Sequence, residues 1–91
     1  MNYNQLNSIL SDTVANNGDL ASLKGTWVTQ LVKVSRFIEM FLEKYGDRIM
    51  GDKDNTPEWN LYNKKTEEYN TYARAIRNVE YFIAKDNVSK L

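Results

Sequence analysis

The sequence predicts an all-α protein with a short N-terminal helix followed by a long antiparallel helical hairpin. Three observations predict it. Apolar residues recur at helical spacing in three segments, residues typical of helix ends separate these segments, and the second and third segments have matched lengths. Residues 1–91 are expected to form a single helical domain with helices at about 3–15, 26–50 and 57–85.

The first expected helix, 3–15, carries apolar side chains on one side, namely Tyr3, Leu6, Leu10 and Val14. Asn16, Asn17 and Gly18 follow it. These residue types tolerate the left-handed backbone that ends many helices, so the helix is expected to stop there. The chain from Asp19 to Gly25 is expected to be a connector with at most one helical turn.

The second expected helix, 26–50, begins at Thr26, which has the side chain of a good N-cap. At 100° per residue, its inner side chains fall within an arc of about 140°. They are Trp27, Val28, Leu31, Val34, Ser35, Ile38, Phe41, Leu42, Tyr45 and Ile49. The opposite side is mostly charged, so the segment is strongly amphipathic.

The third expected helix, 57–85, follows a polar turn at 51–55 and opens with Thr56 as N-cap and Pro57 at the first helical position. Its inner arc holds Leu61, Tyr62, Tyr69, Tyr72, Ala73, Ile76, Val79 and Ile83. At a rise of about 1.5 Å per residue the two long helices are each roughly 35–42 Å long. A short turn between helices of matched length makes them antiparallel neighbours.

Composition excludes several classes of protein. The chain has no cysteine and no histidine, which removes thiolate and Ser-His-Asp catalysis and most transition-metal sites. We therefore expect no enzymatic activity, no cofactor and no metal ion. Lys plus Arg and Asp plus Glu are 12 each, so a nucleic-acid partner is not expected. No apolar run approaches the ~20 residues that span a bilayer, and the polar start does not resemble a signal peptide, so a cytoplasmic location without a membrane partner is expected.

One candidate ligand site lies where the second helix is expected to begin. Lys24, Gly25, Thr26 and Trp27 would bring an ammonium group, free backbone N–H groups, a hydroxyl and an indole together, as a phosphate or nucleotide requires. The alternative is an ordinary N-cap followed by a core tryptophan.

A second candidate lies on the third helix. Lys65 falls within an apolar arc, which is costly unless its charge is paired or solvated. It either extends its ammonium group to solvent or pairs with a glutamate near the end of the bundle, or it joins Tyr62 and Tyr69 in a polar cleft. Among the other candidates, Arg74 and Arg77 could meet phosphates and Tyr72 could stack on a base, or the two arginines are simply solvated.

Four apolar residues lie outside the expected two-helix core, namely Phe37, Met40, Tyr81 and Phe82. The first helix or a second protomer could bury them. We expect a homo-oligomer, and thus an oligomeric helical bundle.

The chain also resembles the small helical sponge proteins with which bacteriophages sequester cyclic-nucleotide signals, the anti-CBASS family and its anti-Thoeris relatives. The resemblance covers about residues 23–83. It rests on Lys24-Gly25, on Pro57-x-Trp59 and on Arg74-Ala75-Ile76. The sequence departs from that family along the start of the third helix, which reads NLYNKKTEEY instead of a Gly/Thr/His/Gln-rich pattern. The resemblance implies an oligomer in the host cytoplasm that binds nucleotides between protomers.

These observations lead to one main hypothesis and two alternatives. The main hypothesis is a non-enzymatic counter-defence protein of a phage or mobile element that withholds a nucleotide-type ligand. The first alternative is a helical inhibitor or immunity-type module, similar in role to an anti-CRISPR protein, that blocks a host protein. The second is a component of a virion or of its assembly.

Overall fold

The computed structural model describes the backbone of residues 1–51 and 57–89 and the side chains of residues 1–46 and 57–88. Within these residues the protein consists of the helices α1 (Tyr3–Ala15), α2 (Leu20–Gly51) and α3 (Pro57–Ser89), with no strand. The prediction of a short helix followed by a long hairpin is confirmed. Of the expected turn at 51–55, Gly51 is instead the last residue of α2, and 52–55 and the expected cap Thr56 lie outside the described residues.

Helix α1 has a defined structure at both ends. At its start, Asn2 and Gln5 form a capping box, in which the Gln5 N–H donates to Asn2 Oδ1 at 2.9 Å and the Asn2 N–H donates to Gln5 Oε1 at 2.8 Å. At its end, Asn17 has a positive φ of 53° and the Gly18 N–H donates to the Thr13 carbonyl at 2.8 Å. This is the Schellman motif, so the predicted stop at 16–18 is confirmed.

Helix α2 begins at Leu20, six residues before the predicted start at Thr26. Asp19 supplies the cap, because its Oδ1 accepts from the Ser22 N–H at 3.1 Å. Gly25 does not interrupt the helix. A glycine in a helix costs only about 1 kcal/mol, which tertiary packing readily offsets. Helix α3 continues to Ser89, beyond the predicted end at 85.

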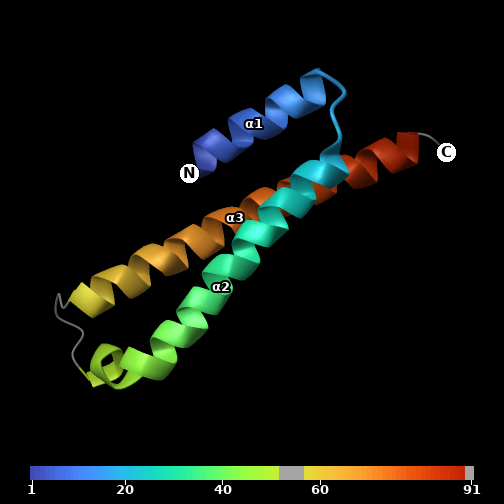
Figure 1. Cartoon of the computed structure of the whole chain (residues 1–91). Helices are drawn as coiled ribbons and strands as arrows, with labels where there is room; N and C mark the ends of the chain where they lie inside the picture. The colour runs from blue at the N-terminus through green and yellow to red at the C-terminus, as the bar shows by residue number, and fades with distance from the viewer. Residues whose placement is uncertain (52–56, 90–91) are drawn as a thin grey trace.

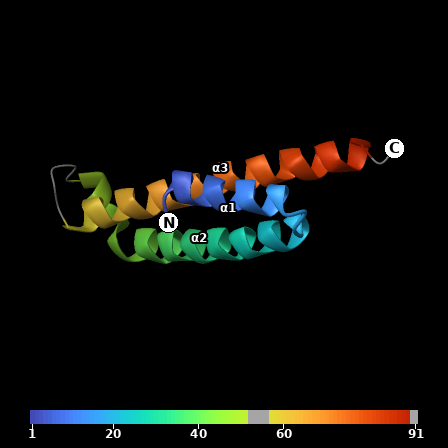
Figure 2. The same cartoon turned by 90° about the horizontal axis from the view of Figure 1, so that it is seen from above.

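The two long helices lie side by side and antiparallel, and α1 lies on one face of this hairpin, parallel to α3 (Figures 1 and 2). The N-terminus of α1 reaches only to about the middle of the hairpin, so one half has three helices and the other has two. The molecule measures 54 × 21 × 16 Å. Its radius of gyration is 16.7 Å, compared with about 12 Å for a compact domain of this length. The fold is therefore an elongated rod.

The core lies where the three helices meet. Leu6 and Val79 are fully buried, and the remaining core residues are Leu10, Trp27, Tyr72, Ala75 and Ile76. Trp27 and Tyr72 thus contribute their large rings to packing between helices. In the two-helix half, Val34 and Phe41 are buried between α2 and α3. No helix within the described residues is long and apolar enough to span a membrane.

The structure of the turn between α1 and α2 predicts opposite changes in stability when Gly18 and Gly25 are replaced by alanine. A Cβ at Gly18 would lie 2.9 Å from Thr13 Cγ2, whereas one at Gly25 would meet nothing within 4 Å. Thr13 cannot rotate away freely, because its hydroxyl donates to the Ile9 carbonyl at 2.8 Å. We expect Gly18→Ala to lower the free energy of unfolding by about 1 kcal/mol and Gly25→Ala to raise it by about 0.5–1 kcal/mol. Urea denaturation of both variants measures this, and equal effects would contradict the described turn.

Candidate functional site

The expected anion site at the start of α2 is not formed. Thr26 is the seventh residue of α2 and no N-cap, and its hydroxyl donates to the Ser22 carbonyl at 3.1 Å. Its backbone N–H belongs to the helix interior, where it meets the carbonyl four residues earlier. The Lys24 ammonium lies 3.3 Å from Glu80 Oε1 on α3. The sequence predicts Thr26 as the N-cap because it places Asp19 in a connector, whereas in the structure Asp19 caps α2.

The aromatic candidates for base stacking are also placed differently. Trp27 and Tyr72 are only 4% and 8% exposed, so their rings are part of the core. Tyr69 remains half-buried on α3. Of the two interpretations of Trp27, the core tryptophan is the one that the structure confirms.

Lys65 pairs with a glutamate, as one of the alternatives predicted. Its Nζ lies 3.4 Å from Glu68 Oε2 and 5.0 Å from the centre of the Phe37 ring on α2. The contact with Phe37 places a cation on an aromatic face, a favourable arrangement. The ammonium is thus already bound by an acid and a ring. Tyr62 stacks on Trp59 with ring centres 5.9 Å apart.

Arg74 lies against α1. Its guanidinium is 4.1 Å from the centre of the Tyr3 ring, at the N-terminal end of α1. Asn78 Nδ2 donates to Tyr3 Oη at 2.7 Å and to Asn7 Oδ1 at 3.2 Å. These contacts fasten the start of α1 to α3. Arg77, the other candidate arginine, is exposed.

The same contacts lower the pKa of the Tyr3 phenol from its ordinary value. The largest cause is hydrogen bonding with Asn7, followed by hydrogen bonding with Asn78, and the positive charge of Arg74 also contributes. Partial desolvation acts in the opposite direction.

The expected interface residues are divided between the two ends of the rod. Because Lys65 contacts Phe37, these two residues lie at the same position along the axis of the rod. Phe82 is 17 residues further along α3 than Lys65, which corresponds to roughly 25 Å. Phe37 and Met40 therefore belong to the two-helix half, and Tyr81 and Phe82 to the three-helix half. The four residues do not form one patch.

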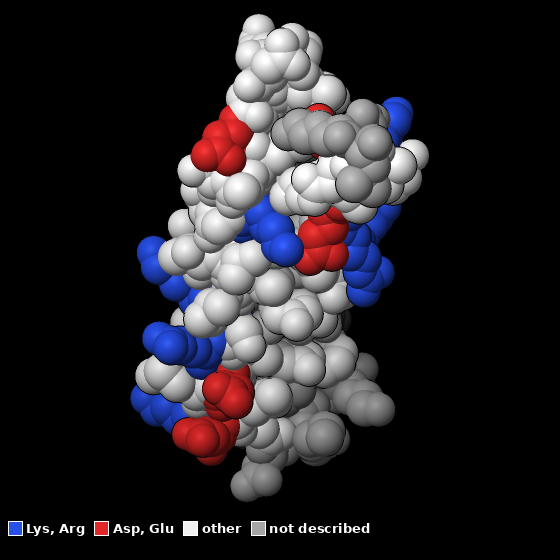
Figure 3. All heavy atoms as spheres, turned by 90° about the vertical axis from the view of Figure 1, so that its right-hand side faces the viewer, with Lys and Arg blue, Asp and Glu red and all other residues white. Residues whose placement is uncertain are grey.

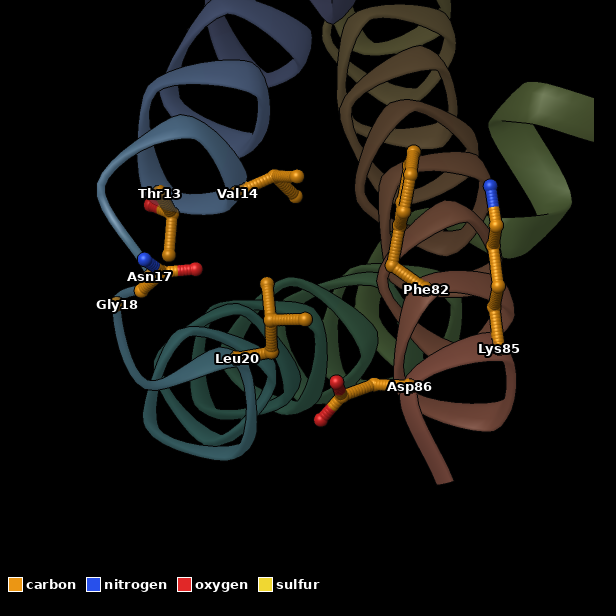
Figure 4. A pocket seen from close by; sticks show the side chains of 8 residues that line it. All are labelled: Thr13, Val14, Asn17, Gly18, Leu20, Phe82, Lys85 and Asp86. Carbon is orange, nitrogen blue, oxygen red and sulfur yellow. The ribbon is translucent and has the colours of Figure 1, made fainter. Parts of the chain in front are cut away.

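A groove of about 520 Å³ lies at the end of the rod where α1, α2 and α3 meet. Figure 4 shows Val14 of α1 and Leu20 of α2 pointing into it, with Phe82 of α3 beside them and the Asp86 carboxylate at its lower edge. Phe82 also packs against the core, so the first helix covers part of it, as one alternative predicted. Tyr81 meets it edge-on at 5.5 Å between ring centres and is 63% exposed.

A larger apolar surface lies in the two-helix half, and its position follows from the residues that contact α1. Leu23 and Thr26 of α2 line one pocket together with Ile9 and Thr13 of α1. Residues seven apart lie on nearly the same side of a helix. We call a row of residues spaced seven apart a column. The column that begins at Leu23 continues through Gln30, Phe37 and Lys44, and the column that begins at Thr26 continues through Lys33 and Met40. Both columns therefore lie on the side of α2 that faces α1 near the start of α2.

The same reasoning applies to α3. Asn78 bonds to α1, and the column it belongs to continues toward the start of α3 through Thr71 and Lys64. The column of Phe82 and Ala75 continues through Glu68 and Leu61. We call the surface made by Lys33, Phe37, Met40 and Lys44 of α2 and Leu61 and Lys64 of α3 the open face. It continues the surface on which α1 lies, but α1 is too short to cover it.

The open face exposes apolar side chains that a third helix would bury. Met40 is 70% exposed, Phe37 39% and Leu61 37%, whereas Phe41, one turn from Phe37, is 8% exposed. The rings of Phe37 and Phe41 are stacked at 5.9 Å and those of Phe41 and Tyr45 lie 5.0 Å apart. Phe37 of the open face is therefore the exposed end of an aromatic row that continues through the buried Phe41 to Tyr45.

On the face shown in Figure 3, acidic and basic side chains are intermixed along the length of the rod. No group of three acidic side chains that could hold a metal ion occurs in the described part of the chain. Comparison with protein-family models, with curated proteins and with solved structures gives no match to this chain.

The lowered pKa of Tyr3 makes stability depend on pH in a defined direction. Because the phenol releases its proton more readily in the folded than in the unfolded chain, the unfolded chain binds more protons just below pH 10. The contribution of the ionised Tyr3 phenol to the free energy of unfolding is therefore present above the ordinary tyrosine pKa, and it is lost as the pH falls through the pKa of Tyr3 in the folded chain. We expect the stability of the native sequence relative to Tyr3→Phe to rise as the pH increases toward about 10, the ordinary tyrosine pKa. Chemical denaturation at several pH values measures the difference, and a difference that falls or stays constant would contradict the described contacts.

Proposed function

We propose that this chain is a non-enzymatic helical binding protein that acts through its open face on another protein. The observation that carries the proposal is the unequal length of the helices. The 13 residues of α1 cover only part of a hairpin whose helices have 32 and 33 residues. Phe37, Met40 and Leu61 are left exposed on a surface that elsewhere binds a helix of the same chain. Exposed apolar side chains that gather on one side of a helix pair are typical of protein interfaces.

The magnitudes indicate what such an interface needs. Fully burying one large apolar side chain contributes about 1.5–3 kcal/mol, and these three are already partly covered. Association costs about 4–15 kcal/mol in lost freedom of motion. Three apolar residues alone would therefore give weak binding, and a specific partner must also use the polar and charged residues around them.

Withholding of a nucleotide, as the sequence resemblance implies, has less support. Of its proposed ligand residues, Trp27 and Tyr72 are buried, Lys24 faces Glu80 and Arg74 lies over Tyr3. A counter-defence role remains compatible with protein binding, since occupying a host protein would serve the same purpose.

The proposal predicts that one side chain decides binding. Met40→Glu places a charge on the open face, and because Met40 is 70% exposed the fold should tolerate it. We expect pull-down from cells that produce the chain to recover one stoichiometric protein, and Met40→Glu to lose it. Tyr81→Glu is the matched control, because Tyr81 is 63% exposed at the other end of the rod.

Circular dichroism checks that both variants keep their helix content. Retention of the partner by Met40→Glu, or its equal loss in Tyr81→Glu, would overturn the proposal. Calorimetry with cyclic di- and trinucleotides is expected to show no binding. Nucleotide binding that persists in Met40→Glu would favour the sponge function instead.

A further inference from the structure

The half of the hairpin that α1 leaves uncovered is long enough to bind a second helix. The N-terminal end of α1 lies near Arg74, whose guanidinium is over the Tyr3 ring, and the part of α3 that precedes Arg74 extends back to Pro57. This stretch of 17 residues is roughly 25 Å long. The columns that face α1 continue along it, so a second helix of about 17 residues would have room beside the start of α1, over Phe37, Met40 and Leu61.

The charges along this surface are not balanced, although those of the whole chain are. The open face and its borders hold four cations, Lys33, Arg36, Lys44 and Lys64, and three acids, Glu43, Glu58 and Glu67, besides Lys65 and Glu68. Lys65 and Glu68 neutralise each other at 3.4 Å. Among the described residues the surface therefore carries an excess of positive charge around its apolar centre.

The N-terminal end of α1 adds to the positive electrostatic potential at this surface. Its first turn holds no acidic residue, and its N-terminus points toward the open face (Figure 1). The N-terminal end of a helix carries a partial positive charge and favours a negative group next to it. The C-terminal end of another helix is such a group, so the field favours a partner that runs in the same direction as α1.

We propose that the occupant of the open face is an acidic amphipathic helix of a partner protein, aligned end to end with α1. This rests on the proposed function and specifies its partner. The apolar stripe of that helix packs on Phe37, Met40 and Leu61, its acidic flanks face Lys33, Lys44 and Lys64, and its C-terminus adjoins the start of α1. Charge complementarity of this kind sets specificity and association rate more than affinity.

A second copy of this chain is a poorer occupant. Two open faces in contact would bring Lys33, Lys44 and Lys64 of one copy close to the same lysines of the other. Helix α1 holds a single acid, Asp12, and is no acidic helix either.

Two stapled 18-residue peptides test the inference. Both carry leucines at i, i+3 and i+7 spacing, and one has glutamates and the other lysines along the flanks. We expect fluorescence anisotropy to show at least about tenfold tighter binding of the glutamate peptide, with the difference shrinking as salt rises. Lys64→Glu should weaken that peptide by about fivefold, whereas Arg77→Glu, an equal charge change at an exposed position outside the open face, should leave it unchanged.

A spin label reports the orientation. At the C-terminus of the glutamate peptide it should broaden the amide signals of Tyr3 and Asn78, and at the N-terminus it should not. The reverse pattern would overturn the end-to-end alignment. Equal binding of both peptides, lost in Met40→Glu, would overturn the acidic partner and leave the proposed function standing.

Three other outcomes also decide against the inference. Glutamate-peptide binding that Lys64→Glu and Met40→Glu do not change would place the site elsewhere. A dimer seen by light scattering and abolished by Met40→Glu would make a second copy the occupant. If neither peptide binds and the pull-down partner survives Met40→Glu, the proposed function itself fails.

Discussion

The reversal of the chain between α1 and α2 determines most of this structure. Asn17 turns the backbone into the left-handed region, Gly18 passes within contact of Thr13, and Asp19 caps α2 at once. Because the connection is so short, α1 must fold back onto the first turns of α2. The position of the core, the burial of Leu6 and Val79 and the extent of the uncovered surface all follow from where this turn places a 13-residue helix.

The amphipathic pattern predicted the helices well, but not all of their ends or neighbours. The bounds of α1 and the start of α3 at Pro57 were predicted because Asn16–Gly18 and Pro57 have strong local preferences. The start of α2 was missed because Thr26 and Asp19 are both good caps, and packing of Leu20 and Leu23 on the core selects the earlier one. The signal was present, since Asp19 stands directly before an apolar pair.

The candidate site was less predictable for a physical reason. A helical wheel identifies an apolar side chain, but it does not say which of two flanks a third helix will cover. Phe82 and Phe37 looked equivalent in the sequence, yet α1 packs near Phe82 and stops short of Phe37. The pairing of Lys65 could be predicted from the sequence, because an unpaired charge in an apolar arc is costly and Glu68 lies one turn away.

The unequal thickness of the rod has a consequence for how the molecule opens. Amide groups beneath α1 are protected by three packed helices, whereas those of α2 and α3 beyond Tyr3 depend on Val34, Phe41 and a single layer of side chains. Proteins open in cooperative units whose free energies follow local burial. The two halves should therefore behave as units of different stability within one continuous pair of helices. A partner that binds the thinner half would raise the stability of that unit most, so binding and local ordering are linked along the length of the hairpin.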